Sequence, residues 1–255
     1  KDPTVLMEFL RRAGGKRARI LILPQASARR DTGQEYVDMF KAFGAKEAVT
    51  LEFRKRSEAG TAEQVKHIRK ASGIFFSGGT QMRISAIMAG TVLESELLAA
   101  YRRGTIVGGT SAGASILSKT MIAYGNGGST PRERMVQFSA GLGFTDKFIF
   151  DQHFRQRDRL GRLIYAVSSY PGAFGVGIDE DTAAIVEDDS RLIACGSGAV
   201  TVVDGFEVTD TDVAEVEHGG AVAVSNLRVH VLTHNSVYDG KSRVATLPSR
   251  QLLLD

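Results

Sequence analysis

Short apolar segments alternate with helical segments in the first half of this chain, and that alternation constrains its fold more than any other feature. Each apolar segment has the composition of a buried strand, and the stretch that follows repeats apolar residues at helical spacing. Repeated strand–helix units predict an α/β fold with a doubly wound, mostly parallel sheet flanked by helices. The expected strands are residues 17–24, 48–53, 73–76 and 105–107, and the expected helices are residues 5–12, 34–43, 61–71, 81–89 and 93–103.

The pattern changes at about residue 182, where short strands follow one another between polar turns and no long helical pattern occurs. We interpret residues 182–255 as an antiparallel, β-rich extension. No proline-rich or glycine/serine-rich linker precedes it, so we predict a single catalytic α/β domain over residues 1–255. The strands expected in the extension are residues 183–186, 192–195, 199–203, 220–224 and 229–233.

The composition is that of an ordinary globular protein, with 43% hydrophobic and 24% charged residues. A net charge of +3 is too small to predict nucleic-acid binding by itself, and no apolar run is long enough to cross a membrane. We therefore expect a cytoplasmic protein with neither nucleic acid nor membrane as a partner. The single cysteine, Cys195, excludes an internal disulfide, and its place in an expected strand predicts a buried side chain.

The first residues fit a helix start, because Asp2 can cap a helix whose first position is Pro3. A doubly wound domain usually begins with a strand before that helix. We expect that such a strand precedes this sequence and is missing from it, together with any targeting segment.

Residues 109–113, Gly-Thr-Ser-Ala-Gly, fit the Gly-x-Ser-x-Gly nucleophile elbow between the expected strand 105–107 and a helix expected over residues 112–118. In such an elbow a strained turn exposes the serine hydroxyl at the carboxyl end of a sheet, and the glycines let the backbone pass closely. Ser111 is thus a candidate nucleophile. An ordinary glycine-rich turn or a phosphate-binding loop would also fit five residues.

In an open parallel sheet the functional site lies outside the carboxyl ends of the strands, where loops 24–28 and 77–81 also occur. A serine nucleophile needs a base, and the chain has five histidines. His67 lies on a polar helix face, His218 precedes a Gly-Gly turn, and His230 and His234 fall in the late strands. His153 follows the expected strand 148–150 among polar residues, which makes it the candidate base.

Four phrases occur in order: Leu-Pro-Gln-Ala-Ser, Phe-Phe-Ser-Gly-Gly-Thr-Gln, Gly-Gly-Thr-Ser-Ala-Gly-Ala and Asp-Gln-His-Phe-Arg-Gln-Arg-Asp-Arg-Leu-Gly-Arg-Leu. Over residues 15–200 the chain resembles the peptidase E-like serine peptidase family, and within it the cyanophycinases. The resemblance implies a fold related to class I glutamine amidotransferases and a Ser-His-Glu triad of Ser111, His153 and Glu180. Asp179 and Asp181 flank Glu180, which leaves the third position open between neighbours.

The resemblance further implies that backbone N–H groups of Ala112 and of either Gly78 or Gly79 form the oxyanion hole. Where the family commonly has Asp, this chain has Thr80, so an acidic contact is missing. Gln81 and Gln152 are the side-chain amides expected to bind substrate.

Four arginines, Arg155, Arg157, Arg159 and Arg162, form the one basic cluster. If the segment is helical, Arg155, Arg159 and Arg162 share one face. A solvated face or a nucleic-acid patch would explain the cluster as well. The resemblance implies that Arg157, Arg159 and Arg162 bind cyanophycin, a poly-aspartate with arginine on each side chain, whose free α-carboxylates suit guanidinium forks.

The implied function is a serine exopeptidase that hydrolyses cyanophycin (multi-L-arginyl-poly-L-aspartate) to β-Asp-Arg dipeptides through an acyl-enzyme, as a homodimer without cofactor or metal. One alternative is an isoaspartyl or α-aspartyl dipeptidase of the same family. Another, of a different class, is a non-catalytic protein that binds a ligand on an amidotransferase-like scaffold.

Overall fold

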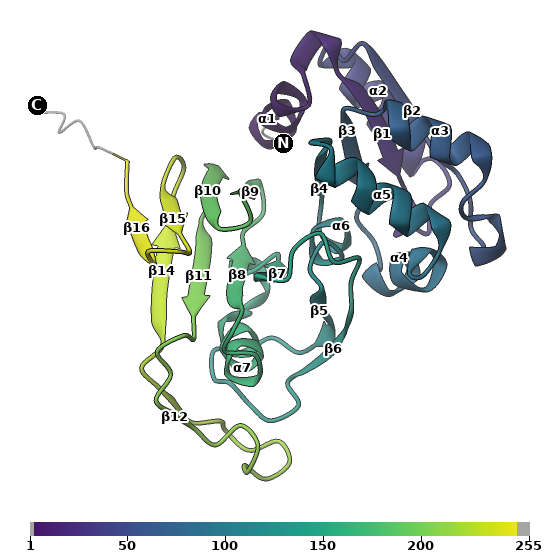
Figure 1. The fold of residues 1–255 in the computed structure, drawn as a ribbon. Helices are drawn as coiled ribbons and strands as arrows, with labels where there is room; N and C mark the ends of the chain where they lie inside the picture. Colours follow the sequence, from purple (N-terminus) through teal and green to yellow (C-terminus); the bar gives the residue numbers. More distant parts are fainter. Residues whose placement is uncertain (1–2, 249–255) are drawn as a thin grey trace, which may run out of the picture. The chain divides into compact units, whose positions relative to one another are not determined.

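The computed structural model describes residues 3–248, which form two compact units (Figure 1). One unit comprises residues 6–124 and 137–152, and the other comprises residues 125–136 and 153–248 with residues 3–5. The predicted cap Asp2 lies outside the described residues. That residues 182–255 belong to the same domain as the rest stays a prediction.

The first unit is built on a parallel sheet of β1 (Arg19–Leu23), β2 (Glu47–Thr50), β3 (Gly73–Phe76) and β4 (Ile106–Gly109), as the alternating pattern predicts. The strand order is β2-β1-β3-β4, and every neighbouring pair is parallel. The register pairs Leu23 with Phe76 and Phe76 with Gly109. The three loops that follow β1, β3 and β4 therefore begin side by side at the carboxyl edge of the sheet.

Helices cover both faces of this sheet, because successive side chains of a strand point to opposite faces. Ile20, Ile22 and Phe75 pack with Phe40 in the core under α1 (Thr4–Arg12) and α2 (Thr32–Ala42). Leu21, Leu23, Ile74 and Phe76 belong to the opposite core, which lies under α3 (Ala62–Lys70), α4 (Gln81–Met88) and α5 (Val92–Arg102). Two short 3₁₀ helices, η1 (Gly15–Arg17) and η2 (Arg56–Glu58), lie in the connections.

No single helix within residues 3–248 is long and apolar enough to cross a membrane. Helices α4 and α5 meet that test only as a pair, which is bent by 105° at the break between them.

The chain leaves β4 through α6 (Ala112–Ser115), β5 (Thr120–Gly125), β6 (Val136–Ala140) and β7 (Phe148–Gln152). The helix expected over residues 112–118 is too long, because α6 ends after one turn. Beyond it the backbone pairs with residues 142–145: the Ile116 carbonyl accepts from the Leu142 amide at 2.7 Å, and the Lys119 amide donates to the Thr145 carbonyl at 2.8 Å. Those tertiary hydrogen bonds replace the helical ones.

The second unit contains η3 (Arg155–Arg157), α7 (Leu160–Ser169) and antiparallel strands, as predicted for the last third of the chain. Strand β11 (Val200–Asp204) pairs with β8 (Phe174–Ile178) and β14 (Arg228–Leu232). Strand β10 (Arg191–Gly196) pairs with β9 (Thr182–Glu187) and β15 (Val237–Asp239), and β15 pairs with β16 (Val244–Thr246). Cys195 on β10 is buried, as expected.

The strand expected over residues 220–224 is wrong in its extent. Strand β13 covers Val224–Ser225 and pairs with β12 (Asp210–Thr211), and before it Ala221 forms an isolated bridge with Arg132. The backbone amides that precede β13 donate to acceptors outside this pair of strands. The Val222 amide donates to the Pro131 carbonyl and the Ala223 amide to the Asp212 carboxylate.

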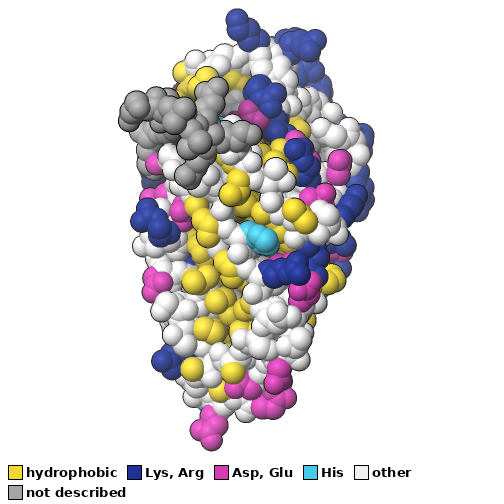
Figure 2. All heavy atoms as spheres, turned by 90° about the vertical axis from the view of Figure 1, so that its left-hand side faces the viewer, with side chains coloured by type: hydrophobic (Ala, Val, Ile, Leu, Met, Phe, Trp, Pro, Cys, Tyr) yellow, Lys and Arg dark blue, Asp and Glu magenta, His cyan; other side chains and the backbone are white. Residues whose placement is uncertain are grey.

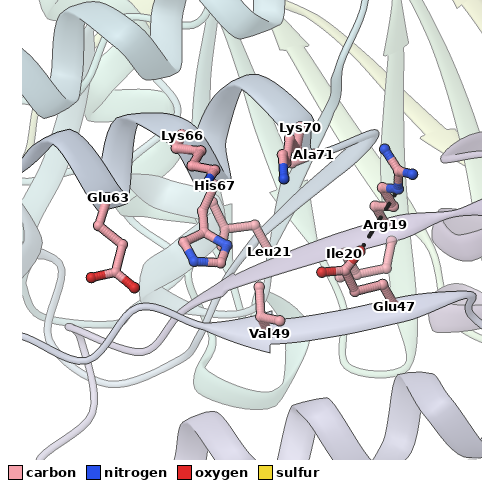
Figure 3. A pocket seen from close by; sticks show the side chains of 10 residues that line it. All are labelled: Arg19, Ile20, Leu21, Glu47, Val49, Glu63, Lys66, His67, Lys70 and Ala71. Carbon is pink, nitrogen blue, oxygen red and sulfur yellow. Dashed lines mark ion pairs between the residues drawn. The ribbon is translucent and has the colours of Figure 1, made fainter.

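A hollow of about 150 Å³ lies between α3 and strands β1 and β2 (Figure 3). Arg19 and Glu47, which line it and face each other as an ion pair at 3.7 Å, are the first residues of β1 and β2. The hollow is thus at the amino ends of the strands, opposite the three loops described above. His67 lines it from α3, together with Lys66 and Lys70.

A buried ionic cluster in the second unit links β11, β15 and the turn that leads into β16. The fully buried carboxylate of Asp204 accepts hydrogen bonds from Arg243 at 2.8 and 2.9 Å, from the Tyr238 hydroxyl at 3.0 Å and from the Phe206 amide at 3.0 Å. Burial alone would raise the pKa of Asp204, but these donors together lower it below its usual value.

We predict that Asp204→Asn lowers the free energy of unfolding by about 2–4 kcal/mol at pH 7, because Arg243 loses its buried counter-charge. A carboxyl whose pKa is depressed on folding stabilises the protein above its unfolded pKa, and this contribution is lost as the pH falls through the folded pKa. The deficit measured by urea denaturation should therefore shrink below about pH 4. Asp210→Asn, at an exposed position on β12, is the control; an equal loss there would contradict the assignment.

Candidate active site

Ser111 occupies a strained turn between β4 and α6. Its backbone has φ 54° and ψ −116°, a conformation that non-glycine residues rarely adopt. Two close backbone approaches hold the turn: a Cβ on Gly109 would collide with the Gly113 carbonyl, and a Cβ on Gly113 would collide with the Phe76 carbonyl. The glycines of the Gly-x-Ser-x-Gly pattern are therefore required by lack of space, and the turn has the geometry of a nucleophile elbow.

Three backbone amides in and near this turn have no acceptor among the residues that the structure describes. Among residues 3–248 nothing accepts a hydrogen bond from the N–H groups of Gly78, Gly79 or Ala112, whereas the neighbouring Ser77 and Thr80 amides are both bonded. A Cβ on Gly78 would lie 3.4 Å from the Ser111 Cβ, so Gly78 lies against the serine. Unpaired amides beside a nucleophile can stabilise negative charge on a substrate carbonyl oxygen.

Gln152, the last residue of β7, lies beside Ser111: the serine Oγ is 3.5 Å from Gln152 Oε1. Gln81 is the first residue of α4. Its Nε2 donates to the carbonyls of Ile122 and Ala123 at 3.0 and 2.8 Å, so the amide nitrogen fixes α4 to β5. Its Oε1 is the atom left for a substrate, and substrate binding by Gln81 stays a prediction.

In the other unit, His153 Nδ1 lies 2.7 Å from Glu180 Oε1. His153 directly follows β7 in the chain, with φ 50°, and Glu180 lies two residues after β8. A carboxylate at this distance fixes the imidazole tautomer and would stabilise the imidazolium, which is what a serine peptidase requires of its base.

Asp179 and Asp181, the acids on either side of Glu180, lie in different surroundings. Asp179 is buried, and its carboxylate accepts from the Arg155 amide at 3.0 Å and from the Ala199 amide at 3.2 Å. Asp181 is exposed in a turn with φ 52°. Sequence reasoning left these three acids as alternatives, and it missed the role of Asp179 because contact with backbone amides leaves no pattern in the sequence.

The arginine cluster does not form the helical face expected for it. Arg155 belongs to η3, Asp158 then adopts φ 45°, and α7 begins only after Arg159. The left-handed residue interrupts the helix, which removes Arg155 from the face. Arg157 is exposed, whereas Arg159 and Arg162 are buried, and Arg162 Nη1 donates to the Gly125 carbonyl at 3.2 Å.

The remaining histidines lie elsewhere. His234 Nδ1 accepts from the Gly196 amide, and the His230 ring packs against Tyr238 with centroids 5.0 Å apart. Within residues 3–248 no group of three or more His, Cys, Asp or Glu side chains is arranged to hold a metal ion.

Comparison with solved structures supports the fold. A peptidase from an acI-B1 Actinobacterium has a TM-score of 0.60 and 20% identity, over 91% of this chain and 88% of that one. A second structure, from Listeria monocytogenes, has a TM-score of 0.53 and 14% identity, over 75% of this chain and 92% of that one. Such likenesses show the α/β fold alone.

The sequence comparisons go further. Curated relatives named cyanophycinase include a protein of Synechococcus elongatus, which is 40% identical over 237 residues (92% of this chain and 74% of the relative). The relative in Geminocystis herdmanii is 37% identical over 93% of this chain and 88% of its own length. One in a Nostoc species is 38% identical over 90% and 78%, respectively. Residues 2–194 match peptidase family S51, and the chain therefore belongs to that family and is a peptidase.

Proposed function

We propose that this chain is a serine exopeptidase that hydrolyses cyanophycin to β-Asp-Arg dipeptides through an acyl-enzyme. Its membership of family S51 and its relatives named cyanophycinase support the substrate. The strained Ser111 beside three unbonded amides is the observation that carries the reaction type. It also argues against a non-catalytic binding protein, which has no use for backbone strain at a serine.

In this proposal Ser111 Oγ attacks the scissile carbonyl, and His153 takes the hydroxyl proton and then gives it to the leaving amine. Glu180 orients His153 through Nδ1 and stabilises the imidazolium. Water then attacks the acyl-enzyme with His153 again as the base. Two contacts support these roles: Glu180 lies 2.7 Å from His153, and Gln152, the residue joined to His153 by a peptide bond, lies beside Ser111.

The amides of Ala112 and of the Ser-Gly-Gly loop would stabilise the tetrahedral oxyanion. Gly78 is the better candidate donor from that loop, because it lies against Ser111, whereas Gly79 lies against the Ala26 carbonyl.

Substrate recognition in this proposal rests on Arg157, Arg159 and Arg162, assisted by Gln152 and by the oxygen of Gln81. Cyanophycin presents a carboxylate on each arginine residue that it carries, and guanidinium groups bind carboxylates through two parallel hydrogen bonds. The exposure of Arg157 suits a direct contact. Arg162 also holds the Gly125 carbonyl, so its loss would disturb the surrounding loop as well.

We further propose that the protein acts in the cytoplasm as a homodimer. Apolar side chains gather on the side of the molecule shown in Figure 2. Among residues 3–248, β14 is the outer strand of its sheet, and its Val229 and Val231 are 49% and 60% exposed. Exposed apolar residues on an outer strand favour association with a second copy. A measurement of the molar mass by light scattering tests whether the protein is a homodimer.

The first prediction from the proposed function concerns the nucleophile. The wild-type protein should release β-Asp-Arg dipeptides from purified cyanophycin, as identified by mass spectrometry, and Ser111→Ala should lower the rate by about a thousandfold or more while still binding the polymer. His153→Ala should be similarly damaging. The double variant should be little worse than either single one, because the two residues act as a unit. Near-normal turnover by Ser111→Ala, or full additivity, would exclude these roles.

The second prediction separates the adjacent acids. Glu180→Gln should lower kcat by at least about tenfold at unchanged stability, because a neutral amide no longer stabilises the imidazolium. Asp179→Asn should instead mainly lower the melting temperature, since one of two partly buried backbone amides loses its acceptor. Asp181→Asn is the exposed control. If Asp179→Asn lowers kcat more than Glu180→Gln, the third triad member has been misassigned.

The third prediction concerns substrate carboxylates. Arg157→Ala, Arg159→Ala and Arg162→Ala should each lower kcat/KM for multi-unit β-Asp-Arg substrates by about ten to a hundredfold. Lysine should restore activity only partly, because it cannot form the planar fork. A small neutral ester offers no carboxylate and should be hydrolysed nearly normally, most clearly by the Arg157 variant. Equal losses on ester and polymer would show that the arginines support the fold or the triad instead.

A further inference from the structure

The loop after β1 carries Gln25, a buried polar residue that the proposed reaction does not use. Gln25 is 1% exposed, and its Nε2 donates to the Leu51 carbonyl at 2.6 Å, just beyond the end of β2. The loop also closes on itself, since the Ser27 amide donates to the Pro24 carbonyl at 2.9 Å. The side chain of Gln25 thus ties a tight turn to the neighbouring strand.

The turn that carries Gln25 is hydrogen-bonded to the Ser-Gly-Gly loop. The Ser77 amide donates to the Leu23 carbonyl at 3.1 Å, and the Thr80 amide donates to the Ala26 carbonyl at 3.0 Å. Between them Gly79 has φ 141°, and a Cβ there would collide with the Ala26 carbonyl. The position of Ala26, the residue after Gln25, therefore sets where the unbonded amides of Gly78 and Gly79 lie.

The hydrogen bonding of Gln25 indicates that its side-chain amide contributes little to the free energy of unfolding. Its Oε1 is buried, and nothing among residues 3–248 donates to it. Leaving a buried acceptor unpaired is unfavourable, and this cost offsets the net contribution of the one hydrogen bond that Nε2 makes. A methionine of similar shape would fill the same space without that cost.

We infer that Gln25 is a positioning residue for the oxyanion hole: through the Ala26 carbonyl it fixes the loop that offers the Gly78 and Gly79 amides. The inference rests on the proposed function. Preorganised donors stabilise a transition state only while their positions are held, and a small displacement has a large effect on rate. Gln25 therefore acts on kcat and leaves substrate affinity and folding almost unchanged.

The test is Gln25→Met. We expect kcat to fall about tenfold on both the neutral ester and cyanophycin, with KM changed less than about twofold and the melting temperature not lowered. Exchange of the Ser77 and Thr80 amides with deuterium should become faster.

Gln64→Met is the matched control. Gln64 is also a glutamine bonded to backbone, because its Nε2 donates to the Glu58 carbonyl and its Oε1 accepts from the Gly60 and Thr61 amides, but it holds the loop before α3. It should lower stability and leave kcat unchanged.

The outcomes distinguish a failure of the Gln25 inference from a failure of the proposed function. A kcat for Gln25→Met within twofold of wild type would overturn the inference, and so would a fall in melting temperature matching that of Gln64→Met with unaltered exchange at Thr80. If the wild type shows no hydrolysis that depends on Ser111, the proposed function fails. The exchange rate at Thr80 then decides alone whether Gln25 positions this loop.

Discussion

The close approach of two backbones at the carboxyl edge of the parallel sheet is the constraint on which the rest depends. Strands β3 and β4 are in register, so Phe76 lies beside Gly109, and the Thr110 amide donates to the Phe76 carbonyl at 3.1 Å. The turn that follows must pass this carbonyl with no room for a Cβ at Gly113. The remaining conformational demand falls on Ser111, where such backbone strain costs about 1–3 kcal/mol. The sheet supplies that energy through its buried apolar faces.

Loops at the ends of parallel strands have backbone groups that the sheet no longer pairs, and here glutamine side chains take over part of that work. Gln25 binds the Leu51 carbonyl on one side of the Ser-Gly-Gly loop, and Gln81 binds the carbonyls of Ile122 and Ala123 on the other. Two amide nitrogens thus restrain a loop that leaves the Gly78 and Gly79 amides unbonded. Free donors are useful in catalysis only when something else holds them in place.

Apolar periodicity predicted the parallel strands, their helices and the antiparallel strands of the second unit. Residues buried on one face of a strand or helix recur as apolar residues at a fixed spacing in the sequence. The elbow at Ser111 was predictable because its glycines are required by space. Other features depend on partners far along the chain. Helix α6 is cut short by bonds to residues 142–145, and Asp158 interrupts the arginine segment. The two anchoring glutamines bind backbone carbonyls that no local pattern reveals.

The three candidate arginines, Arg157, Arg159 and Arg162, have the same side chain but differ in burial. A guanidinium removed from water needs hydrogen-bond acceptors in the protein, and Arg162 finds one in the Gly125 carbonyl. The loop after Gly125 is bound to the same segment, since the Gly161 amide donates to the Gly128 carbonyl at 2.9 Å. Arg162 therefore orders a loop with part of its five-donor fork, and a substrate carboxylate can use only what is left. Arg157, by contrast, is exposed, and its side chain does not order this loop. Its effect on catalysis is consequently the cleanest measure of whether carboxylate recognition, rather than loop order, selects the substrate.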